Sequence, residues 1–370
     1  IKEPLLACPN DPDDVKTLLA QAQMFLAAGR SDEALVALQQ ASRLDPIRGN
    51  IKRGEALAAQ AGLAEAEVAY RAAIEAIESS DVGPAGDSYL AYTGLARVLL
   101  RQGRGDEALE VAQAILDLRP DAYPVHILIG DLYRARGQRT QTLAAYQQAV
   151  RLAPATPLAN SRLGDALLES GQLVEAQTAY EAALAADARY VDGLVGLAKV
   201  LNRSAQAQPE SAQTQWQQAL TLLQRALELN SQSVAAYLTL GDVHRALGQP
   251  VEAAQAYQTV LSLEPDHPTA LQSLGQTLLA AGNVEEAVAS YQAAVAVAPD
   301  AEARARRLLT LAAALRGLKR YDEAEQVYQE ILQADPANTT ARTTLGDLYA
   351  QLERLPEAID QYGQAVRSNP

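Results

Sequence analysis

The chain contains few of the residues that build disulfide bonds, metal centres and membrane spans. It has one cysteine among 370 residues, Cys8, so no disulfide bond can form within the chain. Its three histidines, His126, His244 and His267, lie far apart and lack the ligand spacing of a zinc or iron site, so no metal and no cofactor is expected. Apolar runs fall short of the roughly 20 residues that cross a bilayer, and we expect no membrane insertion by this segment.

Aromatic residues and positive charge are also scarce. The aromatic residues are 15 tyrosines, one phenylalanine and one tryptophan, which predicts that tyrosine fills the same position in successive structural units. The formal net charge of −14 repels nucleic acid and anionic membranes, so nucleic acid is not expected as a partner, whereas a basic partner would be attracted. The alternative is that the negative charge only keeps an extended surface soluble.

A pattern that returns every 34 residues dominates what the sequence does contain. Gly130 recurs as Gly164, and Tyr146 recurs as Tyr180 at the same interval. A fixed period of this length indicates one small structural unit that has been copied and stacked. The stack overrides the two or three globular domains that the length alone would suggest, because it grows in one dimension and needs no single core.

The unit is clearest over residues 125–155. Apolar residues at spacings of three and four on either side of Gly137 predict two amphipathic helices, which end at Gly137 and before Pro154. The unit is therefore a helix hairpin. Gly130 lies in the middle of the first helix, where glycine costs roughly 1 kcal/mol relative to alanine. Its recurrence predicts a close approach of the two helices, with Tyr146 packed beside it.

These units resemble tetratricopeptide repeats. The family's pattern has Leu-Gly in the first helix, glycine at the turn, alanine and an aromatic residue in the second helix, and then proline. One full match consists of Leu274-Gly275, Gly282, Ala287, Tyr291, Ala294 and Pro299. The resemblance extends from about Val15 to Pro370. It implies an all-α fold, a right-handed superhelical solenoid of antiparallel helix hairpins.

We expect an N-terminal extension over residues 1–14 and a single solenoid of about ten repeats over residues 15–370. The expected repeats are 15–48, 49–88, 89–122, 123–156, 157–190, 191–233, 234–267, 268–301, 302–338 and 339–370. The second repeat ends in a stretch, 79–86, whose composition favours a loop. The sixth carries extra polar residues near 202–213, which either protrude or lengthen the hairpin.

The resemblance also indicates where a partner would bind, because the first helices of such repeats line an inner concave surface. The residues that follow the mid-helix glycine are therefore candidate partner-binding residues: Asp131, Asp165, Asp242, Gln276 and Asp347. The first helices of the third and ninth repeats add four basic candidates: Arg97, Arg101, Arg306 and Arg316. A groove of mixed charge suits a protein with its own pattern of charge. The alternative is local pairing within one helix, such as Asp131 with Arg134 and Asp242 with Arg245.

The sequence has no phosphate-binding glycine loop and no nucleophile motif, so it is not expected to be an enzyme. It predicts a protein–protein interaction scaffold or assembly factor that binds a protein or an extended peptide along the concave surface. The alternative is the substrate-recruiting region of a larger enzyme or of a secretion or export machine. A third expectation is self-association through uncapped ends. The lysine-poor composition favours a bacterial source, and the segment is expected in the cytoplasm or periplasm, tethered to a membrane by a missing N-terminal segment.

Overall fold

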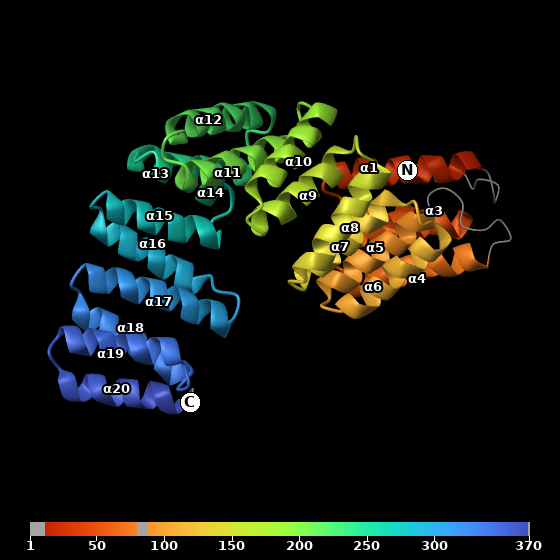
Figure 1. Cartoon of the computed structure of the whole chain (residues 1–370). Coiled ribbons are helices and arrows are strands. Elements are labelled where there is room, and N and C mark those ends of the chain that lie inside the picture. Colours follow the sequence, from red (N-terminus) through yellow and green to blue (C-terminus); the bar gives the residue numbers. More distant parts are fainter. Residues whose placement is uncertain (1–11, 80–87, 369–370) are drawn as a thin grey trace. The chain divides into compact units, whose positions relative to one another are not determined.

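The protein is described here by a computed structural model, which covers residues 12–79 and 88–368 (Figure 1). Within these ranges the regular secondary structure consists of twenty α-helices and no strand. Each odd-numbered helix packs most extensively against the helix that follows it, which makes ten antiparallel hairpins. The predicted all-α solenoid of helix hairpins is therefore confirmed. Residues 1–11 of the expected extension and residues 80–86 of the expected loop lie outside the described ranges.

The chain divides into two compact units, residues 1–188 and 189–370, which are described separately. The helices of the first unit are α1 (Pro12–Ala27), α2 (Ser31–Leu44), α3 (Pro46–Ala59), α4 (Leu63–Glu78), α5 (Ser88–Arg101), α6 (Gly105–Leu118), α7 (Tyr123–Ala135), α8 (Arg139–Leu152), α9 (Pro157–Glu169) and α10 (Leu173–Ala186). Those of the second are α11 (Val191–Ala207), α12 (Ala212–Leu229), α13 (Val234–Ala246), α14 (Pro250–Leu263), α15 (Pro268–Ala280), α16 (Val284–Ala296), α17 (Ala301–Gly317), α18 (Tyr321–Ala334), α19 (Thr339–Gln351) and α20 (Leu355–Ser368).

The core of most hairpins is a tyrosine of the second helix packed against a glycine of the first. Tyr146 on α8 is fully buried, and a Cβ atom placed on Gly130 would lie 2.3 Å from its Cε1 atom. Burial of the ring offsets the weak helix propensity of glycine at this position. The predicted packing of Tyr146 against Gly130 is confirmed. The same pair recurs as Gly54–Tyr70, Gly164–Tyr180, Gly241–Tyr257, Gly275–Tyr291 and Gly346–Tyr362.

The hairpin turns follow the sequence equally closely. Gly137 has φ +69° between α7 and α8, a backbone conformation that favours glycine because it has no Cβ atom. In the sixth hairpin the extra residues lengthen both helices, so that α11 has 17 residues and α12 has 18, against 13 and 14 in α7 and α8. The additional turns are joined across the hairpin by Trp216, whose Nε1 donates to Asn202 Oδ1 at 3.0 Å.

The first helices form the inner side of each unit. In the first unit α1, α3, α5, α7 and α9 each contact the next first helix in this series, and α11, α13 and α15 do so in the second unit. Among the described residues, successive second helices make no contacts of this extent. From α1 to α9 and from α11 to α15, the first helices therefore lie closer together than the second helices, as is expected for the inner side of each unit.

Candidate interaction surface

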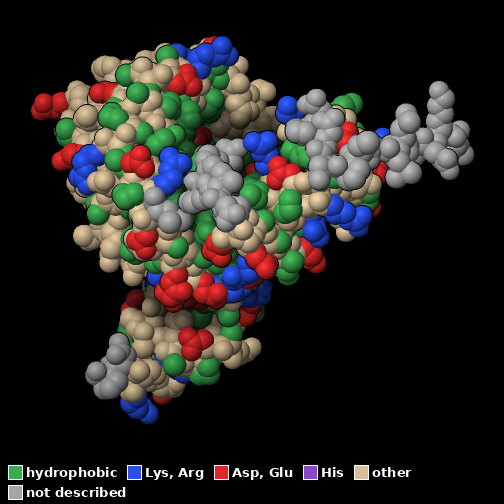
Figure 2. All heavy atoms as spheres, turned by 90° about the vertical axis from the view of Figure 1, so that its right-hand side faces the viewer, with side chains coloured by type: hydrophobic (Ala, Val, Ile, Leu, Met, Phe, Trp, Pro, Cys, Tyr) green, Lys and Arg blue, Asp and Glu red, His purple; other side chains and the backbone are tan. Residues whose placement is uncertain are grey.

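The candidate residues lie on the exposed side of the first helices, which we call the inner surface. One residue of each first helix, directly after the small residue at its centre, forms what we call the inner row. Its members are Gln23, Glu55, Arg97, Asp131 and Asp165 in the first unit, and Lys199, Asp242, Gln276, Ala313 and Asp347 in the second. Acidic, basic and neutral residues thus all occur along the row. The face drawn in Figure 2 likewise carries acidic and basic side chains interspersed with apolar ones.

Four of the predicted carboxylates hold the core tyrosines in place. Each accepts a hydrogen bond from the hydroxyl group of the tyrosine that lies 15 residues later, across the turn of its own hairpin. The bonds are Tyr146–Asp131 (2.6 Å), Tyr180–Asp165 (2.6 Å), Tyr257–Asp242 (2.7 Å) and Tyr362–Asp347 (2.8 Å). These carboxylates are therefore structural as well as partly exposed. Sequence reasoning missed the contact, although the constant spacing between aspartate and tyrosine was the signal for it.

Burial makes Tyr146, Tyr180 and Tyr257 weaker acids than an exposed tyrosine. Burial, strengthened by the hydrogen bond to Asp131, raises the pKa of Tyr146 well above its ordinary value, because both favour the neutral hydroxyl. Burial followed by the charge of Glu55 raises the pKa of Tyr70 to about 12. The phenols therefore remain neutral hydrogen-bond donors throughout the physiological range of pH.

Ion pairs neutralise part of the inner surface in the first unit. Arg162 on α9 lies between two inner-row carboxylates, with Nε 3.6 Å from Asp131 Oδ1 and Nη1 3.6 Å from Asp165 Oδ2. It therefore brings Asp131 and Asp165 together. Arg134, considered above as the local partner of Asp131, instead reaches the next hairpin, where its Nε donates to Glu169 Oε1 at 3.0 Å.

Local pairing within one helix is seen in the second unit. Arg245 Nη2 lies 3.4 Å from Asp242 Oδ1, three residues earlier on α13. Arg306 pairs in the same way with Glu302 on α17. Of the remaining candidates in this unit, Gln276 and Asp347 are exposed and Arg316 is half-buried.

The two predicted arginines of α5 differ in how far they are engaged. Arg101 donates from Nη1 to the carbonyl oxygen of Ala58 at 2.7 Å, which anchors it to the preceding hairpin. Arg97 belongs to the inner row and is exposed. It is therefore the predicted basic residue whose charge is most directly presented to solvent in the first unit.

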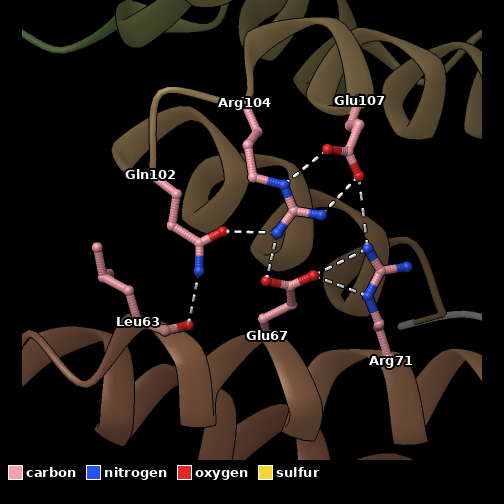
Figure 3. Close-up of polar contacts among 6 residues, drawn as sticks. All are labelled: Leu63, Glu67, Arg71, Gln102, Arg104 and Glu107. Carbon is pink, nitrogen blue, oxygen red and sulfur yellow. Dashed lines mark hydrogen bonds and ion pairs between the residues drawn. The ribbon is translucent and has the colours of Figure 1, made fainter.

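An arginine at the start of α6 joins neighbouring hairpins, and sequence reasoning missed it (Figure 3). Arg104 donates from Nε to Glu107 Oε1 at 2.6 Å, and from Nη1 to Glu67 Oε2 on α4 at 2.7 Å. Arg71 donates to the other oxygen of Glu67 at 2.9 Å. Burial opposes the charged form of Glu67, but these hydrogen bonds lower its pKa below the usual value. The network, which we call the arginine clasp, fixes the second hairpin against the third.

The clasp returns twice in the second unit. Its members there are Arg320 with Glu323 and Glu285, and Arg354 with Glu357 and Glu325. In each case the arginine precedes the second helix and binds the glutamate three residues later as well as a carboxylate of the preceding hairpin. An arginine three residues before glutamate at this position was the sequence signal.

Residues 12–79 and 88–368 hold no group of three or more histidine, cysteine, aspartate or glutamate side chains arranged to bind a metal ion. No helix in the same ranges combines the length and the apolar character needed to span a bilayer.

Family models of the tetratricopeptide repeat match most of the chain. One model matches residues 51–123, 204–268, 238–303 and 273–339, and two others match residues 130–171 and 315–370. These matches cover hairpins in both compact units.

Two curated proteins match shorter stretches. Protein CTR9 homolog of Arabidopsis thaliana is 32% identical over 108 residues, which is 29% of this chain and 10% of that protein. Cellulose synthase operon protein C of Xanthomonas axonopodis pv. citri (strain 306) is 34% identical over 135 residues, which is 33% of this chain and 8% of that protein. The matches thus span about a tenth of the length of these relatives.

Solved structures resemble the chain over nearly its whole length. The human IFIT1 dimer with m7Gppp-AAAA has a TM-score of 0.60 at 18% identity, covering 98% of this chain and 91% of that one. The APC/C hetero-tetramer Cut9–Hcn1 has a TM-score of 0.51 at 16% identity, covering 100% of this chain and 76% of that one. At these identities the likeness shows a shared fold.

Proposed function

Because the chain belongs to the tetratricopeptide repeat family, we propose that it binds a partner protein or an extended peptide along the inner surface and holds it within an assembly. The repeats and the structural relatives support a protein-interaction scaffold as the general class of function. The finer proposal is the place of binding and the nature of the partner.

One observation carries the proposal: the first helices contact one another in series from α1 to α9 and from α11 to α15, so their exposed side chains form a continuous row over these helices. Such a row offers many weak contacts at regular spacing, and an extended chain can use them without a deep pocket. The row carries both signs of charge: in the first unit Arg97 is followed by Asp131 and Asp165. A partner carrying both signs of charge matches this row better than a uniform polycation does.

The experiment must avoid residues that hold the core. Reversing the charge of Asp131 or Asp165 would leave a buried tyrosine hydroxyl without its acceptor, so a loss of binding could reflect unfolding. A photo-crosslinking amino acid placed at Arg97 or Gln276 avoids this problem, because both side chains are exposed. Val174 on α10 and Val251 on α14 are matched controls, since they lie on second helices and are 76% and 63% exposed.

In a lysate of the native organism, we expect the inner-surface positions to crosslink to one specific protein and the two control positions not to do so. Mass spectrometry would identify that protein. Crosslinking confined to the second helices, or equal from both sets of positions, would contradict binding along the inner surface.

A second candidate function is the substrate-recruiting region of a larger enzyme or of a secretion or export machine. The local match to cellulose synthase operon protein C favours it, because the matched region is only 8% of that protein. The same crosslinking experiment distinguishes the candidates. A captured substrate or a catalytic subunit supports recruitment, whereas a structural subunit supports assembly.

A further inference from the structure

The first hairpin lacks the glycine–tyrosine pair that fills most of the others. Leu38 on α2 stands where Tyr146 stands in the fourth hairpin, and Ala22 on α1 stands in the place of Gly130. Both replacements are buried, with 2% and 1% of their surface exposed. A leucine side chain is shorter than that of tyrosine and carries no hydroxyl group, so it cannot reach a residue of the inner row.

A cavity of about 420 Å³ opens at this place, between α1, α2 and α3 on the inner surface. We call it the first-hairpin cavity. Its wall is mostly apolar and its rim is polar. The apolar members are Leu19, Ala22, Leu26, Leu38, Ala56 and Ala59. The polar members are Gln23, Ser31, Lys52, Glu55 and Gln60.

The rim offers the type of acceptor that the core tyrosines use elsewhere. Gln23 and Glu55 both belong to the inner row, like the aspartates that accept from tyrosine at 2.6–2.8 Å. Glu55 binds Lys52 Nζ through Oε2 at 2.8 Å, and its Oε1 makes no hydrogen bond to another described residue. Its side chain is 44% exposed and lines the cavity. An apolar wall beneath a carboxylate acceptor is the environment that surrounds Tyr146.

The geometry points to a tyrosine side chain of the partner as the occupant of this cavity. The ring would pack among Leu19, Leu26 and Leu38, and the hydroxyl would donate to Glu55. The inference rests on the proposed function, because it names one contact of the partner with the inner surface. Tyrosine is a favoured anchor of protein interfaces, since it buries a large rigid ring and still satisfies its hydroxyl group.

The probe for this test is p-cresol, the side-chain analogue of tyrosine, added to the protein with isotope-labelled leucine methyl groups. We expect saturable shifts of the Leu19, Leu26 and Leu38 methyl signals in the NMR spectrum, with no comparable change elsewhere. Diffuse shifts across the chain, or no shifts, would overturn the inference. Because p-cresol binding is measured without the partner, its failure leaves the crosslinking result for the inner surface unaffected.

Two variants should abolish binding in the cavity, one by filling it and one by placing a charge on its wall. The double substitution Ala22→Gly with Leu38→Tyr rebuilds the pair seen in the other hairpins, and both changes are needed because tyrosine excludes a Cβ atom opposite it at Gly130. Leu26→Glu places a charge on the wall at a residue that is 39% exposed, so it leaves the fold intact. Met24→Glu on the same helix is the control, since Met24 is 73% exposed and does not line the cavity.

We expect p-cresol binding to be lost in the double substitution and in Leu26→Glu, and kept in Met24→Glu. If p-cresol still bound to the variant with the rebuilt glycine–tyrosine pair, its binding site could not be the first-hairpin cavity. Glu55→Ala tests the hydroxyl contact. It should weaken the binding of p-cresol by about tenfold, corresponding to about 1.4 kcal/mol. It should leave the binding of toluene, which has the same ring without the hydroxyl group, unchanged. Equal effects on the two probes would show that the cavity selects any apolar ring and not tyrosine.

Discussion

Replacing Gly130 by alanine tests how the hairpins are held together. The added Cβ atom would lie 2.3 Å from Cε1 and 2.5 Å from Cδ1 of Tyr146, well inside van der Waals contact. Tyr146 cannot move away easily, because its ring is fully buried and its hydroxyl group is bound to Asp131 at 2.6 Å. The helices α7 and α8 must therefore separate.

The magnitude follows from two opposing terms. Overpacking of a close-packed site costs about 1–3 kcal/mol. Alanine in place of a mid-helix glycine recovers about 1 kcal/mol of helix propensity. The expected net effect of Gly130→Ala is a loss of about 1 kcal/mol of stability. Gly275→Ala is the matched control, because its Cβ atom would lie 3.1 Å from the ring of Tyr291 and needs only a small adjustment. There the two terms nearly cancel.

Hydrogen exchange is the appropriate assay, because stacked repeats open locally and a single unfolding curve averages over them. Amides of α7 and α8 should exchange faster in Gly130→Ala, whereas those of α15 and α16 should change little in Gly275→Ala. The double substitution Gly130→Ala with Tyr146→Leu should relieve the overlap, as the pairing of Ala22 with Leu38 does in the first hairpin. If Gly130→Ala proved as stable as Gly275→Ala, the steric account of the glycines would be refuted.

Three further predictions concern protonation and the polar contacts. Burial raises the pKa of Tyr70 to about 12, so the stability that its neutral hydroxyl contributes is full below pH ~10 and is lost as pH rises through about 12. Absorbance titration should show late tyrosinate formation near that pH, and Tyr70→Phe should reduce its amplitude by one tyrosine. Hydrogen bonds, one of them from Arg104, overcome the effect of burial and lower the pKa of Glu67. Glu67→Gln should therefore speed amide exchange in α4 at neutral pH and match the wild-type exchange rate at strongly acidic pH. An equal difference in exchange rate at the two pH values would contradict the role of the charged carboxylate. Asn202→Ala should lower the free energy of unfolding by about 1–3 kcal/mol, because it removes the hydrogen-bond acceptor of Trp216. It should also alter the fluorescence of this tryptophan, and unchanged emission would argue against the hydrogen bond.

The repeat itself was readable from the sequence because each unit makes its main contacts locally. Gly130 and Tyr146 lie 16 residues apart within one hairpin, so their spacing already predicts that they meet, and the structure confirms it. Gly137 marked the end of a helix, and α7 ends two residues before it, at Ala135. Local steric rules of this kind repeat with every copy and therefore strengthen one another.

The polar contacts were harder to predict because their partners lie beyond one hairpin or across its turn. Arg134 had an aspartate three residues away in sequence, yet it binds Glu169 of the next hairpin. The choice depends on how far one hairpin is offset from the next, which residue spacing alone does not define. The first-hairpin cavity was missed for a different reason: Leu38 is an ordinary apolar residue, and only comparison with Tyr146 shows what it leaves empty.

The lengthened sixth hairpin shows where this protein tolerates change. Its extra residues lengthen α11 and α12, and the tip, residues 208–210, is exposed. Residues added at such a tip leave the packing of neighbouring hairpins untouched, whereas an insertion inside a helix would shift every later side chain around the helix axis. The hairpin tip is therefore a suitable insertion site, at which a fluorescent domain or an affinity tag can be added while the row of first helices stays in register.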